Sequence, residues 1–153
     1  MVPKGSLGWV VLSILALSLP EVGADTITSR MFVEPSSSKL AGGTAHLVVG
    51  VLNRHDSSYT GNYRIKVFPY FFKSESGKLL IKVSEPLLKR MIAGGATSFA
   101  GSAITDGTGE TRKITAKARP AASDPRAGAL TFTVATENGP LVFNTSYRIG
   151  RPQ

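Results

Sequence analysis

The sequence predicts an all-β protein, and within that class an immunoglobulin-like β-sandwich of seven to nine short strands. Three observations indicate this fold. Gly, Ser, Thr and other β-branched residues are spread evenly along the chain, turn residues recur at short intervals, and several segments alternate apolar with polar side chains. Many short alternating segments separated by turn signals are typical of two packed antiparallel sheets.

Four strands are expected in the first half of the chain. Segments 26–33 and 44–52 are rich in β-branched residues, and the first ends at a Pro- and Ser-rich turn. Segment 62–72 is the longest, and Pro69 within it lacks an N–H donor, so the strand is an edge or bulges there. A Ser- and Gly-containing turn then makes 78–83 its hairpin partner. The stretch between the second and third strands is expected to be a polar loop.

The second half is expected to contain four more strands and one irregular element. Segment 85–95 is expected to be a short helical turn or a loop whose leucines cover the end of a core. Segments 96–104 and 111–119 flank a Gly-rich turn. Segments 129–136 and 141–149 alternate most clearly, and the Asn-Gly-Pro sequence between them is a turn signal.

Residues 1–24 have the three parts of a cleavable signal peptide. Lys4 is the basic residue, 9–19 is an apolar run, and small residues precede Asp25. A membrane-spanning helix needs about 20 apolar residues, so this run is too short for one. The sequence therefore predicts an exported, not membrane-spanning protein with a single domain at 25–153.

Composition narrows the compartment and the kind of partner. The chain has no cysteine. Disulfides are common in secreted animal proteins, so this absence favours a protein of the bacterial periplasm or cell surface. Lys and Arg number 18 against 10 Asp and Glu, a formal net charge of +8. The basic residues are scattered and form no nucleic-acid motif, so nucleic acid is not expected. Such a surface favours an acidic polymer, anionic lipid heads or an acidic protein face, or serves solubility alone.

The sequence predicts no catalytic residue, metal or cofactor. Nucleophilic catalysis needs a Ser or Cys nucleophile beside a positioned base. The chain has no cysteine and no G-x-S-x-G motif that would mark a nucleophilic serine. His46 and His55 are nine residues apart without a third ligand, unlike a zinc site. A small enzyme built around His55 and Asp56 is kept as a third hypothesis.

Five segments resemble the N-terminal immunoglobulin-like domain of periplasmic pilus chaperones. Segment 27–33 resembles that family's first strand, which carries a basic residue, and 47–53 resembles its second strand, which ends in Asn. Segment 83–86 resembles its Ser-Pro segment, and 109–114 resembles the strand after its turn. Segment 140–149 resembles its last strand. The last of these alternates apolar residues and then carries a base.

The resemblance implies a chaperone-like module that binds a partner by strand pairing. Arg30 and Arg148 would anchor the partner's C-terminal carboxylate, to which a guanidinium can bind bidentately. Leu141 and Phe143 would fill the partner's groove, while backbone hydrogen bonds supply affinity. The alternative is a basic cell-envelope module that binds an anionic polymer or a lipid surface through its charge.

Overall fold

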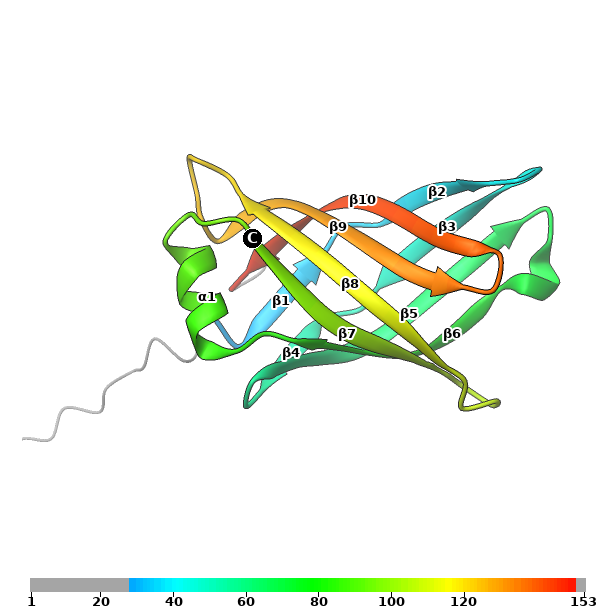
Figure 1. The fold of residues 1–153 in the computed structure, drawn as a ribbon, viewed down its shortest axis with the longest axis horizontal. Coiled ribbons are helices and arrows are strands. Elements are labelled where there is room, and N and C mark those ends of the chain that lie inside the picture. The colour runs from blue at the N-terminus through cyan, green and yellow to red at the C-terminus, as the bar shows by residue number, and fades with distance from the viewer. Residues whose placement is uncertain (1–27, 151–153) are drawn as a thin grey trace, which may run out of the picture.

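A computed structural model describes residues 28–150, which form one antiparallel sheet closed on itself, with a short helix at one end (Figure 1). The strands are β1 (Arg30–Val33), β2 (Ser36–Leu40), β3 (Gly43–Val49), β4 (Leu52–His55), β5 (Ser58–Phe68), β6 (Glu75–Lys82), β7 (Thr97–Thr105), β8 (Thr111–Pro120), β9 (Ala127–Thr136) and β10 (Gly139–Ile149). The helices are the 3₁₀ turn η2 (Phe71–Lys73) and α1 (Glu85–Ile92). The signal peptide expected at residues 1–24 lies outside the described residues.

The ten strands occupy the eight positions of an up-and-down barrel. β1 and β2 follow one another along one line and pair with β4 and β3, which form the next line. β5 pairs with both β3 and β4, and each later strand pairs with its neighbour in the chain. β10 then pairs with β9 and β1 and closes the sheet.

The predicted all-β class is confirmed, but the sheet closes into one barrel where an immunoglobulin-like pair of sheets was expected. The reason is physical: period-2 alternation requires one buried and one exposed face, and both architectures supply these. The barrel differs from the sandwich in that strands adjacent in the sequence pair with one another. The alternation of side chains within a single strand does not show which strands pair.

Two segments expected to be irregular are strands. The serines at 36–38, expected to form a turn, begin β2 and pair with β3. The expected polar loop 53–61 contains most of β4 and the start of β5, because Tyr59 points into the barrel and is fully buried. β5 itself ends at Phe68, before Pro69, so the expected strand 62–72 is cut short there.

A β-bulge lies where β3 gives way to β4. Val49 is opposite Tyr63, whereas Asn53 is opposite Thr60, so the pairing with β5 shifts by one residue between them. The Gly50 N–H donates to the Asn62 carbonyl oxygen at 2.8 Å within this step. Such a bulge bends a strand and helps a sheet to close.

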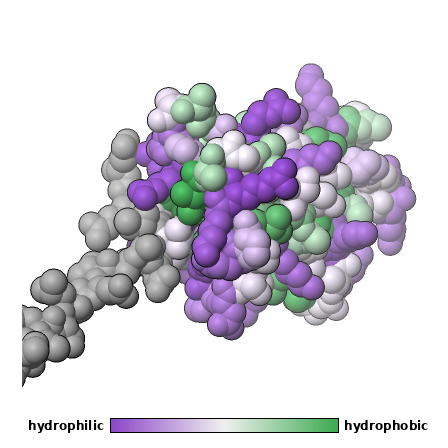
Figure 2. Space-filling view, turned by 60° about the vertical axis from the view of Figure 1, so that its left-hand side comes forward, coloured by the Kyte–Doolittle hydropathy of each residue, from purple (hydrophilic) through white to green (hydrophobic). Residues whose placement is uncertain are grey.

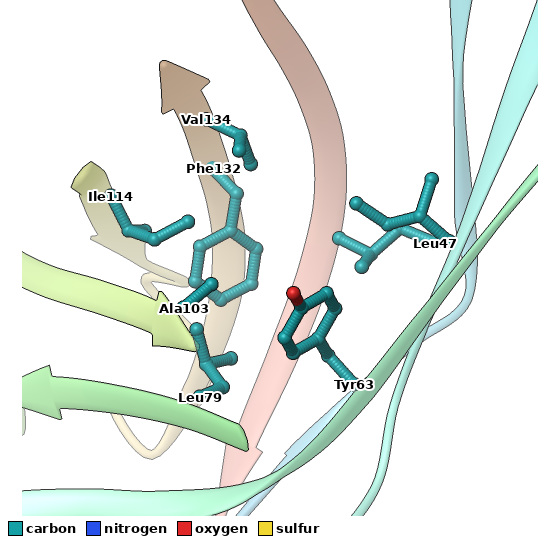
Figure 3. Close-up of a pocket in the computed structure, with 8 residues that line it drawn as sticks. Leu47, Tyr63, Leu79, Ala103, Ile114, Phe132 and Val134 are labelled. Carbon is teal, nitrogen blue, oxygen red and sulfur yellow. The ribbon is translucent and has the colours of Figure 1, made fainter. Parts of the chain in front are cut away.

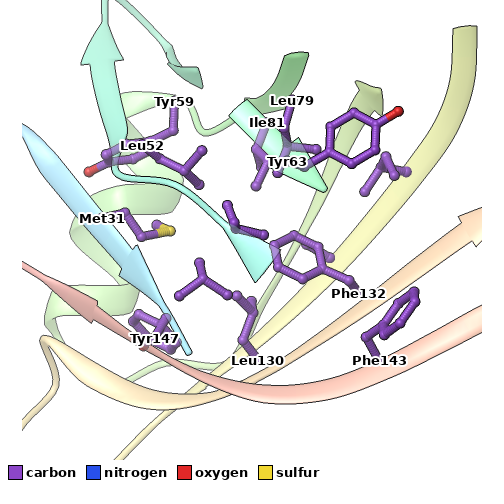
Figure 4. Packing of buried hydrophobic residues seen from close by; sticks show 14 of the residues in the cluster. Met31, Leu52, Tyr59, Tyr63, Leu79, Ile81, Leu130, Phe132, Phe143 and Tyr147 are labelled. Atoms are coloured by element: carbon purple, nitrogen blue, oxygen red, sulfur yellow. The ribbon is translucent and has the colours of Figure 1, made fainter. Parts of the chain in front are cut away.

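Apolar side chains fill the barrel (Figure 4). Its largest fully buried side chains include Tyr59, Phe132, Phe143 and Met31. An apolar cavity of about 20 Å³ remains, across which Tyr63 and Phe132 face one another (Figure 3). That volume is about one water probe, and an apolar lining gives water few partners. This cavity is therefore a packing gap, too small for an organic ligand.

α1 covers the end of the barrel, as expected of the leucine-rich segment that contains it (Figure 1). Pro86 stands in the first turn, where its missing N–H costs nothing. Leu88 and Met91 are buried in the core, and Glu85 pairs with Arg54 of β4 at 3.3 Å. No helix within residues 28–150 is long and apolar enough to cross a membrane.

Candidate anion-binding groove

The exposed faces of the described strands carry basic side chains and no acidic ones. Acidic residues within 28–150 lie in connections or at the first position of an element: Glu34, Asp56, Glu75, Glu85, Asp106, Glu110, Asp124 and Glu137. The strands instead carry exposed basic side chains: Arg30, Lys39, Arg64, Lys66, Lys78, Lys82, Lys113, Lys117, Arg119 and Arg148. The described outer wall is therefore cationic, with no interspersed carboxylates.

A groove of about 590 Å³ runs between α1 and the outer faces of β7, β8 and β9. Its lining contains three basic residues, Arg90, Lys117 and Arg119, and no acidic residue. Figure 2, which brings the α1 end forward, shows hydrophilic side chains over much of this side of the barrel, with small hydrophobic patches between them. Unlike the apolar cavity inside the barrel, this hollow is open to solvent and lined with charged side chains.

Small side chains on the neighbouring strands give the groove its depth. Lys117 is opposite Ser98 of β7 on one side and Thr131 of β9 on the other. Arg119 is opposite Ala129 of β9. Because the flanking positions carry short side chains, the two long basic side chains of β8 stand beside open space that a ligand can enter.

The groove's cations are free of intramolecular ion pairs. Within residues 28–150 the ion pairs engage Arg54 and Arg112, and none involves Arg90, Lys117 or Arg119. Arg90 is further positioned by the turn after α1, since a Cβ at Gly95 would lie 2.8 Å from Arg90 Cγ. Glycine at that position lets the Arg90 stem lie against the backbone at the groove's edge.

Thr97 belongs to the groove lining, but its hydroxyl is buried on the inner side of β7. This residue is only 7% exposed, and its Oγ1 has no hydrogen-bond partner among the described residues. It is the first residue of β7 and lies opposite Ala118 of β8, which is also buried. Ser98 and Lys117, which lie opposite one another, are exposed on the other face of the same two strands. The side chains that a ligand in the groove can contact are therefore those of the outer face.

Arg30 and Arg148 lie near one another on the barrel wall, outside the groove lining. Phe32, two residues after Arg30, is opposite Arg148 in the pairing of β1 with β10, so both guanidinium groups leave the same outer face. Both residues are exposed, and neither has an ion pair within the described residues. They flank no pocket that we find in this part of the chain.

The other two residues expected to bind a partner face the interior. Phe143 is fully buried, and Leu141 is half-buried and packs against the core. β10 pairs with β9 along its length and with β1 at its C-terminal end. Strand addition at β10 would therefore have to use the seam beside β2, where Thr145 Oγ1 donates to the Glu34 carbonyl oxygen at 2.6 Å.

The histidines are separated from the groove and from one another. His55 ends β4 and is exposed, with Asp56 in the turn after it. His46 lies on β3, where its Nδ1 is 2.7 Å from Ser37 Oγ. Within the described residues, no group of three or more His, Cys, Asp or Glu side chains could hold a metal ion.

A cluster of titratable groups at the opposite end of the barrel is satisfied internally. Arg112 donates to both oxygens of Glu75, and the Tyr63 hydroxyl donates to Glu75 Oε1 at 3.2 Å. Burial raises the pKa of Tyr63, and the hydrogen bond to Glu75 raises the pKa of Arg112. With donors and acceptors matched, this cluster ties strands together and offers no free group to a ligand.

The sequence predicted an anionic partner as one alternative, but it did not predict the groove. The alternation of Lys113, Lys117 and Arg119 along 111–119 is a readable signal of a basic strand face. Arg90 and Thr97 carry no comparable signal, because only the closed barrel brings them beside β8. Comparisons with protein-family models, curated proteins and solved structures find no match.

Proposed function

We propose that this protein is a non-enzymatic binding module for a linear anionic polymer, which lies in the groove between α1 and the wall of β7, β8 and β9. The observation that carries the proposal is the groove's lining of Arg90, Lys117 and Arg119 without any carboxylate. The sequence pattern at 1–24 supports an exported site of action, in the periplasm or at the surface of a bacterium.

The spacing of the cations suits an extended ligand. Side chains two residues apart on a strand leave the same face about 7 Å apart. Lys117 and Arg119 therefore form a short row, and Lys113 extends it along β8 beyond the groove. A polymer that carries repeated phosphate, sulfate or carboxylate groups can contact several of these cations at once, whereas an isolated small anion contacts one or two.

The groove also offers a contact that does not depend on net charge. The Ser98 hydroxyl, on the exposed face opposite Lys117, can donate to an oxygen of the bound group. Hydrogen bonds and charge together distinguish a binding groove from a wall that is basic only for solubility. Strand pairing at β10 has less support, because its ladder with β9 is complete and Phe143 is in the core.

The test compares two variants that lose the same charge. Lys117→Gln/Arg119→Gln removes two cations from the groove, and Arg30→Gln/Arg148→Gln removes two from the wall outside it. Binding of the full chain to fluorescently labelled polyphosphate, dextran sulfate and polyglutamate is measured by anisotropy at increasing salt. The three probes separate phosphate, sulfate and carboxylate recognition.

The groove variant should bind at least about fivefold more weakly, since an exposed charge contact contributes up to about 1 kcal/mol. The control should change affinity less than about twofold, and wild-type binding should weaken as salt screens the charges. Equal weakening in both variants would show that net charge alone attracts the polymer. A larger effect in the Arg30/Arg148 variant would move the site to the wall of β1 and β10.

A further inference from the structure

The end of the barrel opposite α1 carries an exposed aromatic cluster. Four aromatic residues lie at the end of β5 and in its connection to β6: Phe68, Tyr70, Phe71 and Phe72. Phe71 is 65% exposed and Phe72 is 81% exposed. Soluble proteins rarely leave large apolar side chains together in water unless the patch binds something.

The cluster is held in a defined shape. The Phe68 and Phe71 rings meet edge to face with centroids 5.8 Å apart, and the Tyr70 and Phe72 rings do so at 6.0 Å. Tyr70 also packs against the neighbouring β2–β3 turn, where a Cβ at Gly42 would lie 3.2 Å from its hydroxyl oxygen. Phe71 and Phe72 consequently stand outermost, as a projection and not as the lining of a groove.

Basic residues lie beside this projection. Lys73 follows it directly, with Nζ 5.4 Å from the centre of the Tyr70 ring. Lys66 lies two residues before Phe68 on the same face of β5. Lys39 lies near the end of β2, two strands from Phe68, because Thr44 of β3 pairs with both residues. The nearest carboxylate in sequence, Glu75, is neutralised by Arg112 at 3.0 Å. An apolar tip with a cationic rim is complementary to a surface that is anionic outside and apolar beneath.

From this arrangement we propose that the β5–β6 connection docks on the surface of an anionic lipid bilayer, with Phe71 and Phe72 entering the interfacial region and Lys39, Lys66 and Lys73 contacting headgroups. Aromatic side chains favour the membrane interface, and basic residues beside them gain from the negative surface potential. The groove is lined in part by α1, which lies at the other end of the barrel (Figure 1). A docked barrel would thus present its groove away from the bilayer.

A site-specific probe separates this contact from membrane binding by residues 9–19. Trp9 is the only tryptophan in the chain, so Trp9→Phe/Phe72→Trp places the sole indole in the cluster. The matched control, Trp9→Phe/Ala122→Trp, places it in the exposed β8–β9 loop at the other end. Emission of each full-length variant is recorded with vesicles of phosphatidylcholine alone, or with phosphatidylglycerol added, and brominated acyl chains as quencher.

Emission from position 72 should shift to the blue and be quenched with anionic vesicles, while emission from position 122 should not change. Phe71→Ser/Phe72→Ser should lower partition into these vesicles about tenfold, on the basis of the apolar area removed. Val51→Ser/Val142→Ser, which removes two exposed apolar side chains elsewhere, should leave partition nearly unchanged.

Three results would overturn the proposal. Equal quenching at positions 72 and 122 would indicate adsorption without orientation. Unchanged emission at position 72 with both kinds of vesicle would show that the cluster does not meet lipid. Emission at position 72 that is already blue-shifted without vesicles would show that the cluster is covered. A blue shift that decreases on dilution would indicate a second copy of the chain, and one that does not would indicate the chain's own residues. None of these results bears on polymer binding in the groove.

Discussion

Arg112 on β8 holds the carboxylate of Glu75 on β6 in a bidentate ion pair that crosses over β7. Both side chains are mostly buried, at 20% and 14% exposure. Glu75→Gln should lower the free energy of unfolding by about 2 kcal/mol, because it leaves the guanidinium of Arg112 partly buried without an anion. Urea denaturation measures the loss. Glu110→Gln, which removes a more exposed partner of Arg112 3.6 Å away, is the control and should change stability by less than about 0.5 kcal/mol.

Tyr147 should make the protein sensitive to alkali. Burial, with a further contribution from Asp124, raises the pKa of Tyr147 to about 12. In the unfolded chain the hydroxyl ionises near its ordinary value of 10.0, so stability is complete below pH 10 and is lost as the pH rises toward 12. Tyr147→Phe should remove this part of the pH dependence, which denaturation curves at pH 9 and pH 11 measure.

At neutral pH the same substitution should not destabilise the protein. The Tyr147 hydroxyl has no hydrogen-bond partner among the described residues, so its removal relieves a desolvation cost and raises the free energy of unfolding by up to about 1 kcal/mol. Burial also raises the pKa values of Tyr59 and Tyr63. Both residues are present in the wild type and in the variant, so their contributions to the alkaline pH dependence cancel when the two proteins are compared. A loss of more than 1 kcal/mol would show that the hydroxyl has a partner.

Phe143 should prove to be a core residue. Phe143→Ala should lower the free energy of unfolding by about 3–5 kcal/mol, since it removes a fully buried ring. Val142→Ala next to it, at 41% exposure, should cost less than about 1 kcal/mol. A tolerated Phe143→Ala that still abolished capture of a protein partner from an envelope extract would instead favour strand pairing through β10.

Ser98 should matter for binding and not for folding. Ser98→Ala removes only a hydroxyl from the exposed face of the groove. Its melting temperature should equal that of the wild type, while its affinity for the preferred polyanion falls about threefold or more. Thr97→Val, which removes a buried hydroxyl without a partner among the described residues, is the control and should leave the affinity unchanged.

Local patterns predicted most of the strands. Segments 129–136 and 141–149 became β9 and β10 because Leu130, Phe132 and Val134, and likewise Phe143, face the interior at alternate positions. The failures have tertiary causes. Ser36 and its neighbours look like a turn by composition, but pairing with β3 makes them a strand. Closure into a barrel depends on which strands pair, which no single segment records.

The candidate groove was beyond the reach of sequence for a similar reason. The positions of Lys117 and Arg119 in the sequence predict a basic strand face. The depth of the groove depends on Ser98, Ala129 and Thr131, and only the strand register places these residues beside β8. The expected Arg30 and Arg148 pair does share a face. The role of this pair as an anchor for a carboxylate remains a prediction, since we find no pocket beside it among the described residues.

The most direct test of the groove is an NMR titration of ¹⁵N-labelled full-length protein with the polyanion that binds best. If the polyanion binds in the groove, the largest amide shifts should fall on Thr97, Ser98, Lys117, Arg119 and Thr131, and they should disappear in Lys117→Gln/Arg119→Gln. Shifts of similar size all around the barrel wall, or shifts centred on Arg30 and Arg148, would contradict it.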